Sequence, residues 1–143
     1  MAASDLPLLG PPPPASSGTL IAIPAFDEAT RVACVVARAR AAMPGAEVVV
    51  VDDGSRDHTS ARAREAGALT VRHPFNLGYG AALQTAYKYA VRRGHRRLVQ
   101  LDADGQHDPA DMPRLLAPLE RGEADVAIGS RFAAGAEIGR AHV

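Results

Sequence analysis

The sequence predicts an α/β domain, with a Rossmann-like, mostly parallel β-sheet and flanking helices. Strand-like and helix-like segments alternate along most of the chain, which is typical of parallel strands joined by helices. The four valines at 48–51 form a continuous β-branched run, as expected for a strand that is covered on both faces. Polar clusters follow several of these strands, and open α/β sheets bind ligands beyond the carboxyl ends of their strands.

The first part of the chain predicts two strands around one helix. Residues 19–25 are a short apolar run, and residues 46–53 contain the valine run. Between them, residues 27–43 have apolar side chains at helical spacing, acids at the start and Pro44-Gly45 at the end. The apolar positions of this helix are Val32, Val35, Val36, Ala39 and Met43.

The middle of the chain repeats the pattern. A short helix is predicted at about 57–66, a strand at 68–73, a helix at 78–94 and a strand at 96–104. The helix at 78–94 ends in arginines and a glycine, which suit a helix C-terminus. Its predicted buried face consists of Leu83, Ala86, Tyr87, Ala90 and Val91.

The last part of the chain predicts one more helix and one more strand. Residues 109–122 have helical periodicity, but Pro113 and Pro118 predict a kinked or broken helix. Residues 124–131 are expected to be the fifth strand of the sheet. The apolar positions of the helix are Met112, Leu115, Leu116 and Leu119.

Composition indicates one domain without a basic excess. A chain of 143 residues is long enough to bury a sizeable core. Its sixteen basic and sixteen acidic residues cancel, which argues against nucleic acid as a partner. The single cysteine, Cys34, is expected to be a buried thiol in a reducing, cytoplasmic compartment.

Residues 1–18 contain four consecutive prolines and are expected to form a disordered leader. No stretch reaches the roughly 18 consecutive apolar residues of a transmembrane helix, so we expect a cytoplasmic protein that is at most peripheral at the inner face of a membrane. The basic segment at 88–97 is interpreted as a solvated helix end that complements the helix dipole, in preference to a contact with anionic lipid.

Asp102 and Asp104 lie at the end of the strand predicted at 96–104, with one residue between them. In extended backbone, alternate side chains share a face, so the two carboxylates are expected to converge. Converging carboxylates repel unless a cation lies between them, and a hard divalent ion prefers oxygen ligands and substrate phosphates. Gln106 and His107 are within reach as further ligands. The pair predicts Mg²⁺ or Mn²⁺ with a phosphorylated ligand, and a solvated loop is the alternative.

Two other strand ends suggest a nucleotide. Asp53 follows the valine run, and a carboxylate there can accept a hydrogen bond from a nucleobase NH with assistance from Ser55. The segment "HPFNLGYGAA" places Asn76 and Gly78 at the mouth of a helix, where backbone NH groups favour anions. Ordinary turn formation and helix capping are the alternative interpretation of the Asp53 segment.

Five motifs occur in an order and spacing that resemble the inverting family 2 glycosyltransferases with the GT-A fold. The likeness is greatest to the dolichyl-phosphate mannosyltransferase and polyprenyl-phosphate glycosyltransferase branch. The motifs are "IPAFDE", "VVVVDDGSRDHT", "NLGYGAAL", "LDADGQHDP" and "VAIGSR", within residues 20–131. The resemblance implies that residues 19–131 bind a UDP- or GDP-linked sugar and that the sugar is transferred to a lipid-phosphate or glycan acceptor.

The resemblance also implies roles for individual residues. It makes Asp102, Asp104 and Arg131 candidate catalytic residues, with Arg131 meeting phosphate. An acceptor phosphate is already anionic and needs no strong general base, which favours a polyprenyl phosphate. The implied nucleotide contacts are Pro24, Phe26, Glu28 and Asp53, and the implied metal and diphosphate contacts are Asp102, Asp104 and Gln106.

The sequence departs from the resembled family in length, because family members continue well beyond the position of Arg131. Residues 132–143 are therefore expected to be a truncated tail, and the chain alone is expected to transfer sugar poorly. The strand at 124–129 would lack the antiparallel neighbour that the family places between it and the strand at 96–101. An exposed sheet edge of that kind predicts self-association. A non-catalytic nucleotide-sugar-binding fragment is the alternative to an active enzyme.

Two other enzyme classes fit less well. Haloacid-dehalogenase phosphatases also carry two aspartates after a strand, but on the first strand and followed by Thr or Val. Here the pair follows the fourth predicted strand and precedes Gln106 and His107. A sugar-nucleotide pyrophosphorylase would carry a glycine-rich loop after the first strand, where this chain has "PAFDE".

Overall fold

The computed structural model describes residues 18–129 and 139–140. Its centre is a four-stranded sheet with the strand order β3-β2-β1-β4, in which every neighbouring pair is parallel. The predicted α/β fold with a mostly parallel sheet is confirmed. The strands are β1 (Thr19–Ala25), β2 (Glu47–Asp52), β3 (Leu69–Arg72) and β4 (Arg97–Gln100).

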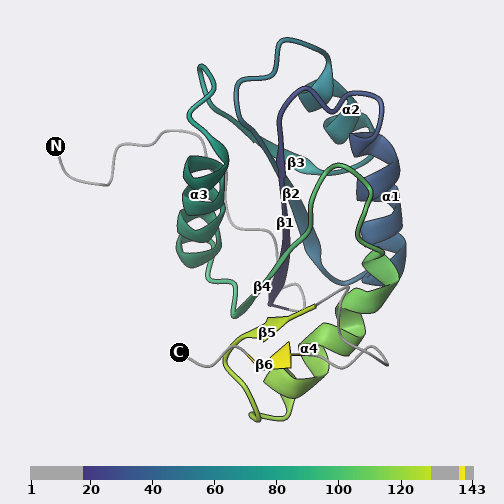
Figure 1. Ribbon diagram of the computed structural model, residues 1–143, viewed down its shortest axis with the longest axis vertical. Helices are drawn as coiled ribbons and strands as arrows, with labels where there is room; N and C mark the ends of the chain where they lie inside the picture. Colours follow the sequence, from purple (N-terminus) through teal and green to yellow (C-terminus); the bar gives the residue numbers. More distant parts are fainter. Residues whose placement is uncertain (1–17, 130–138, 141–143) are drawn as a thin grey trace, which may run out of the picture.

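Helices cover both faces of this sheet (Figure 1). Helices α1, α2 and α4 share one hydrophobic cluster with the sheet, whereas α3 packs on the opposite face in a second cluster. Figure 1 shows α3 alone on its side of the sheet. The helices are α1 (Val32–Ala42), α2 (Thr59–Glu65), α3 (Tyr79–Arg92), the 3₁₀ turn η1 (Pro109–Asp111) and α4 (Met112–Glu120).

The two faces of the sheet follow from alternation along the strands. In β1, Ile21 and Ile23 pack toward α1, while Leu20 and Ala22 pack toward α3. Residues 20–23 are fully buried, as the continuous apolar run predicts. Side chains on both faces therefore hold the sheet in the middle of the domain.

The predicted buried face of α3 is wrong for Tyr87 and Val91, because the helix is turned relative to the expected orientation. Tyr87 is 46% exposed and Val91 is 79% exposed. The side chains that pack on the sheet are small alanines, and Tyr89 joins them because its hydroxyl donates to Glu47. Small residues let the α3 backbone lie close to the sheet, which leaves the larger Tyr87 and Val91 on the outside. The buried residues of α3 are Ala82, Ala86, Tyr89 and Ala90.

The predicted fifth strand of the sheet is also wrong. Within the described residues, only Ala127–Ile128 (β5) is extended in that segment, and it pairs antiparallel with Gly139–Arg140 (β6) in a separate two-stranded ladder. Val126 and Ile128 are half-exposed, so the segment lacks the cover on both faces that a central parallel strand requires. Strand β5 has β6 as an antiparallel neighbour, but no strand within the described residues joins this ladder to β4. In the described part of the chain, β4 pairs with β1 alone.

Three helix and strand boundaries shift. Helix α1 begins at Val32 rather than at 27, because Asp27 has a φ of 51° and belongs to a loop. Strand β4 ends at Gln100, and the chain then turns. The predicted break in the helix at 109–122 lies at Met112, where 3₁₀ winding changes to α. Pro113 is tolerated there because it lies in the first turn of α4.

Cys34 is exposed, so the predicted buried thiol is wrong. It lies on α1 beside residues that face the core, and the helix directs it outward. The predicted leader lies outside the described residues apart from Gly18, as does the predicted tail apart from residues 139–140. None of the helices in the described segments is long and apolar enough to cross a membrane.

Candidate functional site

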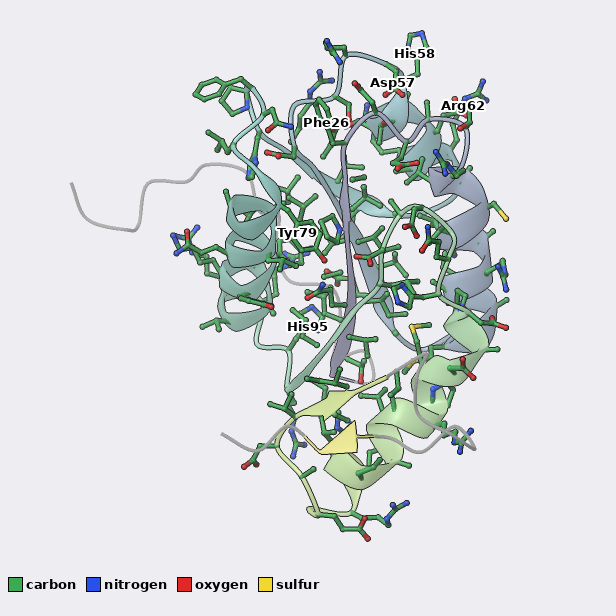
Figure 2. The ribbon with its side chains drawn as sticks, in the orientation of Figure 1. Phe26, Asp57, His58, Arg62, Tyr79 and His95 are labelled. Atoms are coloured by element: carbon green, nitrogen blue, oxygen red, sulfur yellow. The ribbon has the colours of Figure 1, made fainter. Side chains whose placement is uncertain are left out.

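Three polar loops meet at the carboxyl edge of the sheet, where β1, β2 and β4 end. They are residues 26–31, 53–58 and 101–108, and the β3–α3 loop at 73–78 lies beside them. Parallel strands bring their carboxyl ends to one edge, which is where α/β proteins bind ligands. Figure 2 shows Phe26, Asp57 and His58 together at this end, and His95 toward the other end. In the fourth predicted cluster, Arg131 lies outside the described residues, and β5, the strand before it, lies outside the four-stranded sheet.

The loops after β1 and β2 are hydrogen-bonded into one unit. The Asp27 backbone NH donates to Ser55 Oγ at 2.9 Å. Arg56 donates to Asp27 twice, from its backbone NH at 2.8 Å and from its guanidinium at 3.0 Å. These hydrogen bonds lower the pKa of Asp27. Ser55 is buried and its oxygen is already used, so it acts between the two loops rather than reaching toward a base.

The predicted nucleotide contacts in the first motif, "IPAFDE", differ in how exposed their side chains are. Phe26 is 39% exposed, and the Arg56 guanidinium lies 5.8 Å from its ring centre. The Glu28 side chain forms an ion pair with Arg31, with Oε2 3.0 Å from Nε. The Glu28 backbone NH donates to Thr59 Oγ1. Pro24 is buried inside β1. Phe26 is therefore the side chain of this motif that the edge presents most openly.

Asp52 and Asp53 are both buried, but they serve different loops. Asp52 Oδ1 accepts from the Ser55 NH at 2.8 Å, and Oδ2 accepts from the Ser60 hydroxyl. These bonds fix the turn after β2 and tie it to α2. Asp53 was predicted as a site residue from the sequence, whereas this role of Asp52 was not.

Asp53 holds the start of α3. Its Oδ1 accepts from His73 Nδ1 at 2.7 Å and from the Leu77 NH at 2.9 Å, and its Oδ2 accepts from the Gly78 NH at 2.9 Å. Burial alone would raise the pKa of Asp53, but these hydrogen bonds outweigh it and lower that pKa. A carboxylate has about four acceptor positions, so three donors leave about one for a ligand.

His73 extends this network into the helix. Its Nε2 lies 2.8 Å from Thr85 Oγ1, and Asp53 is an acceptor only, which places the ring proton on Nδ1. The β3–α3 loop also packs against Gly54, where a Cβ atom would lie 2.4 Å from the Phe75 carbonyl carbon. Gly78 has a φ of 100° at the N-terminal boundary of α3. Asn76 is exposed on the same loop. His73 and Thr85 carried no sequence signal that sets them apart from core residues.

Asp102 and Asp104 lie beyond the end of β4, and Asp104 lies in a turn, so the predicted continuous strand through both residues is wrong. The chain leaves β4 after Gln100 and turns at residues 103–105, where Gly105 has a φ of 78°. Asp104 Oδ1 accepts from the Gln106 NH at 2.9 Å, which closes the turn. Gly105 adopts the left-handed conformation that this turn requires, which costs glycine little because it has no Cβ atom.

Tyr79 and His107 contact the first aspartate. The Tyr79 hydroxyl lies 3.0 Å from Asp102 Oδ1 and accepts from Gln100 Nε2 at 2.5 Å. His107 Nδ1 lies 3.5 Å from Asp102 Oδ2. Burial and the hydrogen bond to Asp102 raise the pKa of Tyr79 to about 12. Tyr79 lies in the quoted "NLGYGAAL" motif, but its contact with Asp102 depends on the packing of α3 beside β4.

A cavity of about 770 Å³ extends from this edge along β4 toward α4 and β5. Asp102, His107 and Asp111 line its polar end. Leu98 and Leu115 are among its apolar walls. No group of three or more His, Cys, Asp or Glu side chains within the described segments forms a complete metal cage. A cation at Asp102 and Asp104 would have to take ligands from a substrate or from water.

An open parallel α/β sheet with carboxylates, a glycine-rich helix start and a cavity at its carboxyl edge defines a nucleotide-binding class of protein. Comparison with known proteins specifies the class. The model of "Glycosyl transferase family 2" matches residues 20–143. The chain belongs to this family, and its sheet with flanking helices has the GT-A fold.

Two curated relatives are polyprenyl-phosphate enzymes by name. The "Polyprenol monophosphomannose synthase" of Mycolicibacterium smegmatis is 37% identical over 126 residues, covering 84% of this chain and 47% of the relative. The "Undecaprenyl-phosphate mannosyltransferase" of Micrococcus luteus is 36% identical over 124 residues, covering 83% of this chain and 50% of the relative. The chain thus spans about half the length of the curated relatives it matches.

A solved structure gives the same fold. Glucosyl-3-phosphoglycerate synthase from Mycobacterium tuberculosis, in complex with Mn²⁺, UDP and glucosyl-3-phosphoglycerate, has a TM-score of 0.57 and 26% identity. The match covers 71% of this chain and 39% of that one. The likeness supports the nucleotide-binding interpretation of the carboxyl edge.

Proposed function

We propose that this chain is the donor-binding half of an inverting glycosyltransferase that binds a nucleoside-diphosphate sugar, UDP- or GDP-linked, with Mg²⁺ or Mn²⁺. The observation that carries the proposal is the first turn of α3, which contacts both carboxylate groups of the edge. Gly78 donates to Asp53, and the Tyr79 hydroxyl donates to Asp102. A nucleotide at the β2 end and a diphosphate at the β4 end would therefore bind against one rigid element.

The residues present fit a divalent ion that arrives with its substrate. Asp102 and Asp104 offer hard oxygen ligands, and Mg²⁺ usually binds proteins through one or two carboxylates and completes its shell with water and phosphate. Gln106 is exposed on the same turn. The bound ion would supply stabilisation of the negative charge that develops on the leaving diphosphate.

The chain's own residues would bind and orient the nucleotide. Phe26 presents an exposed ring that the Arg56 guanidinium approaches on one side. Glu28, Asn76 and Gly78 line the neighbouring loops. Asp53 would act mainly by holding the loop that carries Asn76, and its remaining acceptor position is open to a base NH. Arg131 remains a proposed phosphate contact that lies outside the described residues.

For the acceptor we propose a polyprenyl (dolichyl-type) phosphate, with another glycan acceptor as the wider class. The named mannosyltransferase relatives support this choice. A phosphate oxygen is anionic at neutral pH and attacks without a strong general base. Self-association through the outer edge of β4 and a cytoplasmic, membrane-peripheral location are parts of the same proposal.

A non-catalytic nucleotide-sugar-binding fragment is the second candidate function. The matches cover 47% and 50% of the two named relatives, so sugar transfer by this chain is itself a proposal, and donor binding without transfer is the result that would favour the second candidate. In-line attack requires residues that hold the acceptor behind the anomeric carbon, and such positioning contributes strongly to rate.

Calorimetry tests donor binding. We expect UDP or GDP to bind in the presence of Mn²⁺ and to bind much more weakly after chelation, and Asp104→Asn to remove most of the metal dependence. Glu65→Gln is the control, because Glu65 is an exposed carboxylate on α2 that does not line the cavity. Equal binding with and without metal would disprove the metal role. Sugar transfer to a polyprenyl phosphate by this chain would separate the enzyme from the non-catalytic fragment.

A further inference from the structure

The outward side of α3 combines apolar and basic side chains. Tyr87 and Val91 form one row at i and i+4, and Lys88 and Arg92 form the adjacent row. Val91 is 79% exposed, and Tyr87, which is 46% exposed, also borders the cavity along β4. Lys88 and Arg92 are exposed too, and neither has an acidic partner among the described residues. We call these four residues the α3 outer face.

The helix dipole does not account for this surface. Arg92 lies in the last turn, where a cation is favourable. Lys88 lies a turn earlier, and the dipole gives no reason to expose Val91 and Tyr87. The predicted burial of Tyr87 and Val91 is wrong, so these two apolar side chains add to the basic segment a surface that the helix dipole does not explain.

The charge of the surrounding segment has one sign. No Asp or Glu occurs between Glu65 and Asp102, although the whole chain carries sixteen acids. The same segment contains Arg72, Lys88, Arg92, Arg93, Arg96 and Arg97. Arg97 lies 3.7 Å from Glu120, and Arg72 donates to the Ser55 backbone carbonyl. Lys88 and Arg92 are exposed on α3 itself, so they make α3 locally positive on the side of the sheet that it alone covers (Figure 1).

The loop that precedes α3 adds further apolar side chains at the ligand end. Phe75 is 64% exposed and Leu77 is 49% exposed. A face of this kind, with aliphatic and aromatic residues beside Lys and Arg, is the composition of helices that lie in the interface of an anionic membrane. Tyr suits the same place, because its ring is apolar and its hydroxyl stays hydrated.

We propose that the α3 outer face, together with Phe75 and Leu77, rests on an anionic lipid bilayer. A second copy of the chain fits less well, because a two-fold contact would bring cations of one α3 against those of the other without acids to pair them. Nucleic acid fits less well, because a phosphate backbone would pair with the cations but would offer no apolar surface to Val91. The donor site lies at the amino end of α3, so this placement would hold it beside the bilayer.

Vesicle flotation tests the proposal without any sugar donor. We expect the wild type to bind phosphatidylcholine vesicles that contain about one third phosphatidylglycerol, and not vesicles of phosphatidylcholine alone. Lys88→Gln with Arg92→Gln should weaken binding roughly tenfold or more. Val91→Gln should weaken it about threefold while keeping the charge. The matched control is Arg62→Gln with Arg64→Gln on α2, which removes two exposed charges from the opposite side of the sheet.

Four results would overturn the proposal. In the flotation assay, these are no vesicle binding by the wild type, an equal loss of vesicle binding in the α2 control, and wild-type vesicle binding by Val91→Gln. The fourth is light scattering that shows a wild-type dimer and a monomeric Val91→Gln variant. RNA binding as tight as vesicle binding would also count against a lipid surface. The link to a lipid-phosphate acceptor rests on the proposed function, but the two fail separately. Calorimetry with UDP and Mn²⁺ reports donor binding without vesicles, and the surface variants should keep wild-type affinity in it.

Discussion

Replacing Asp53 by Asn should destabilise the domain because the carboxylate is buried and accepts three hydrogen bonds. It is 4% exposed and accepts hydrogen bonds from His73, Leu77 and Gly78. An amide has one acceptor oxygen, so its NH₂ group would face at least one of these donors. A hydrogen bond to a charged group contributes about 1.5–3 kcal/mol, and a buried donor left unpaired costs a similar amount.

We therefore expect Asp53→Asn to lower the free energy of unfolding by about 2–4 kcal/mol at pH 7. For a domain of this size, that corresponds to a fall of roughly 5–15 °C in Tm. Urea and thermal unfolding measure both quantities. Asp125→Asn serves as the control, because an exposed aspartate should change stability by no more than about 0.5 kcal/mol.

The pH dependence gives the same experiment a second readout. The folded-state pKa of Asp53 is lowered, so its contribution to stability is fully present above the unfolded pKa of about 3.9 and is lost as pH falls through the folded value. The stability difference between wild type and Asp53→Asn should stay constant from pH 7 to about 5 and shrink below about pH 4. A difference that is absent at pH 7, or that grows on acidification, would refute the assignment.

Two further variants probe the turn of α3. Gly54→Ala should lower the free energy of unfolding by more than about 2 kcal/mol, because the φ of Gly54 is 75° and the new Cβ would overlap the Phe75 backbone. Gly78→Ala should lower it by only about 1–2 kcal/mol, because the space around Gly78 is open. Urea unfolding should rank them in that order. Tyr79→Phe should lower Mn²⁺-dependent UDP affinity roughly tenfold, because outer-shell partners orient metal ligands, while changing the free energy of unfolding by less than about 1 kcal/mol. Unchanged affinity would show that Tyr79 does not position Asp102.

The layered fold could be predicted because the strands are recognisable from their local sequence. The β-branched valine run of β2 and the short apolar run of β1 favour buried strands, and their flanking helices follow from the spacing of apolar residues. Where the prediction failed, the local pattern was ambiguous. Tyr87 and Val91 share helical spacing with the true buried positions of α3, and only the close approach of Ala82 and Ala86 to the sheet decides which side faces inward.

The candidate site was predicted as a location, but its internal contacts were not. The carboxyl edge follows from parallel strands, so the loops after β1, β2 and β4 were expected to meet. The partners of Asp53 and Asp102 depend on the position of α3, which spacing alone does not give. His73 and Thr85 are 12 residues apart, and nothing in the sequence marks them as bonded.

The start of α3 connects the two carboxylates of the candidate site, Asp53 and Asp102. Its first turn receives the Asp53 carboxylate through Leu77 and Gly78 and reaches Asp102 through Tyr79. The two carboxylates follow strands that are not neighbours, because β1 lies between β2 and β4. A displacement of α3 would therefore change the nucleotide side and the metal side of the edge together. The same helix carries the α3 outer face on its other side, so contact with a bilayer would act on an element that both ends of the donor site share.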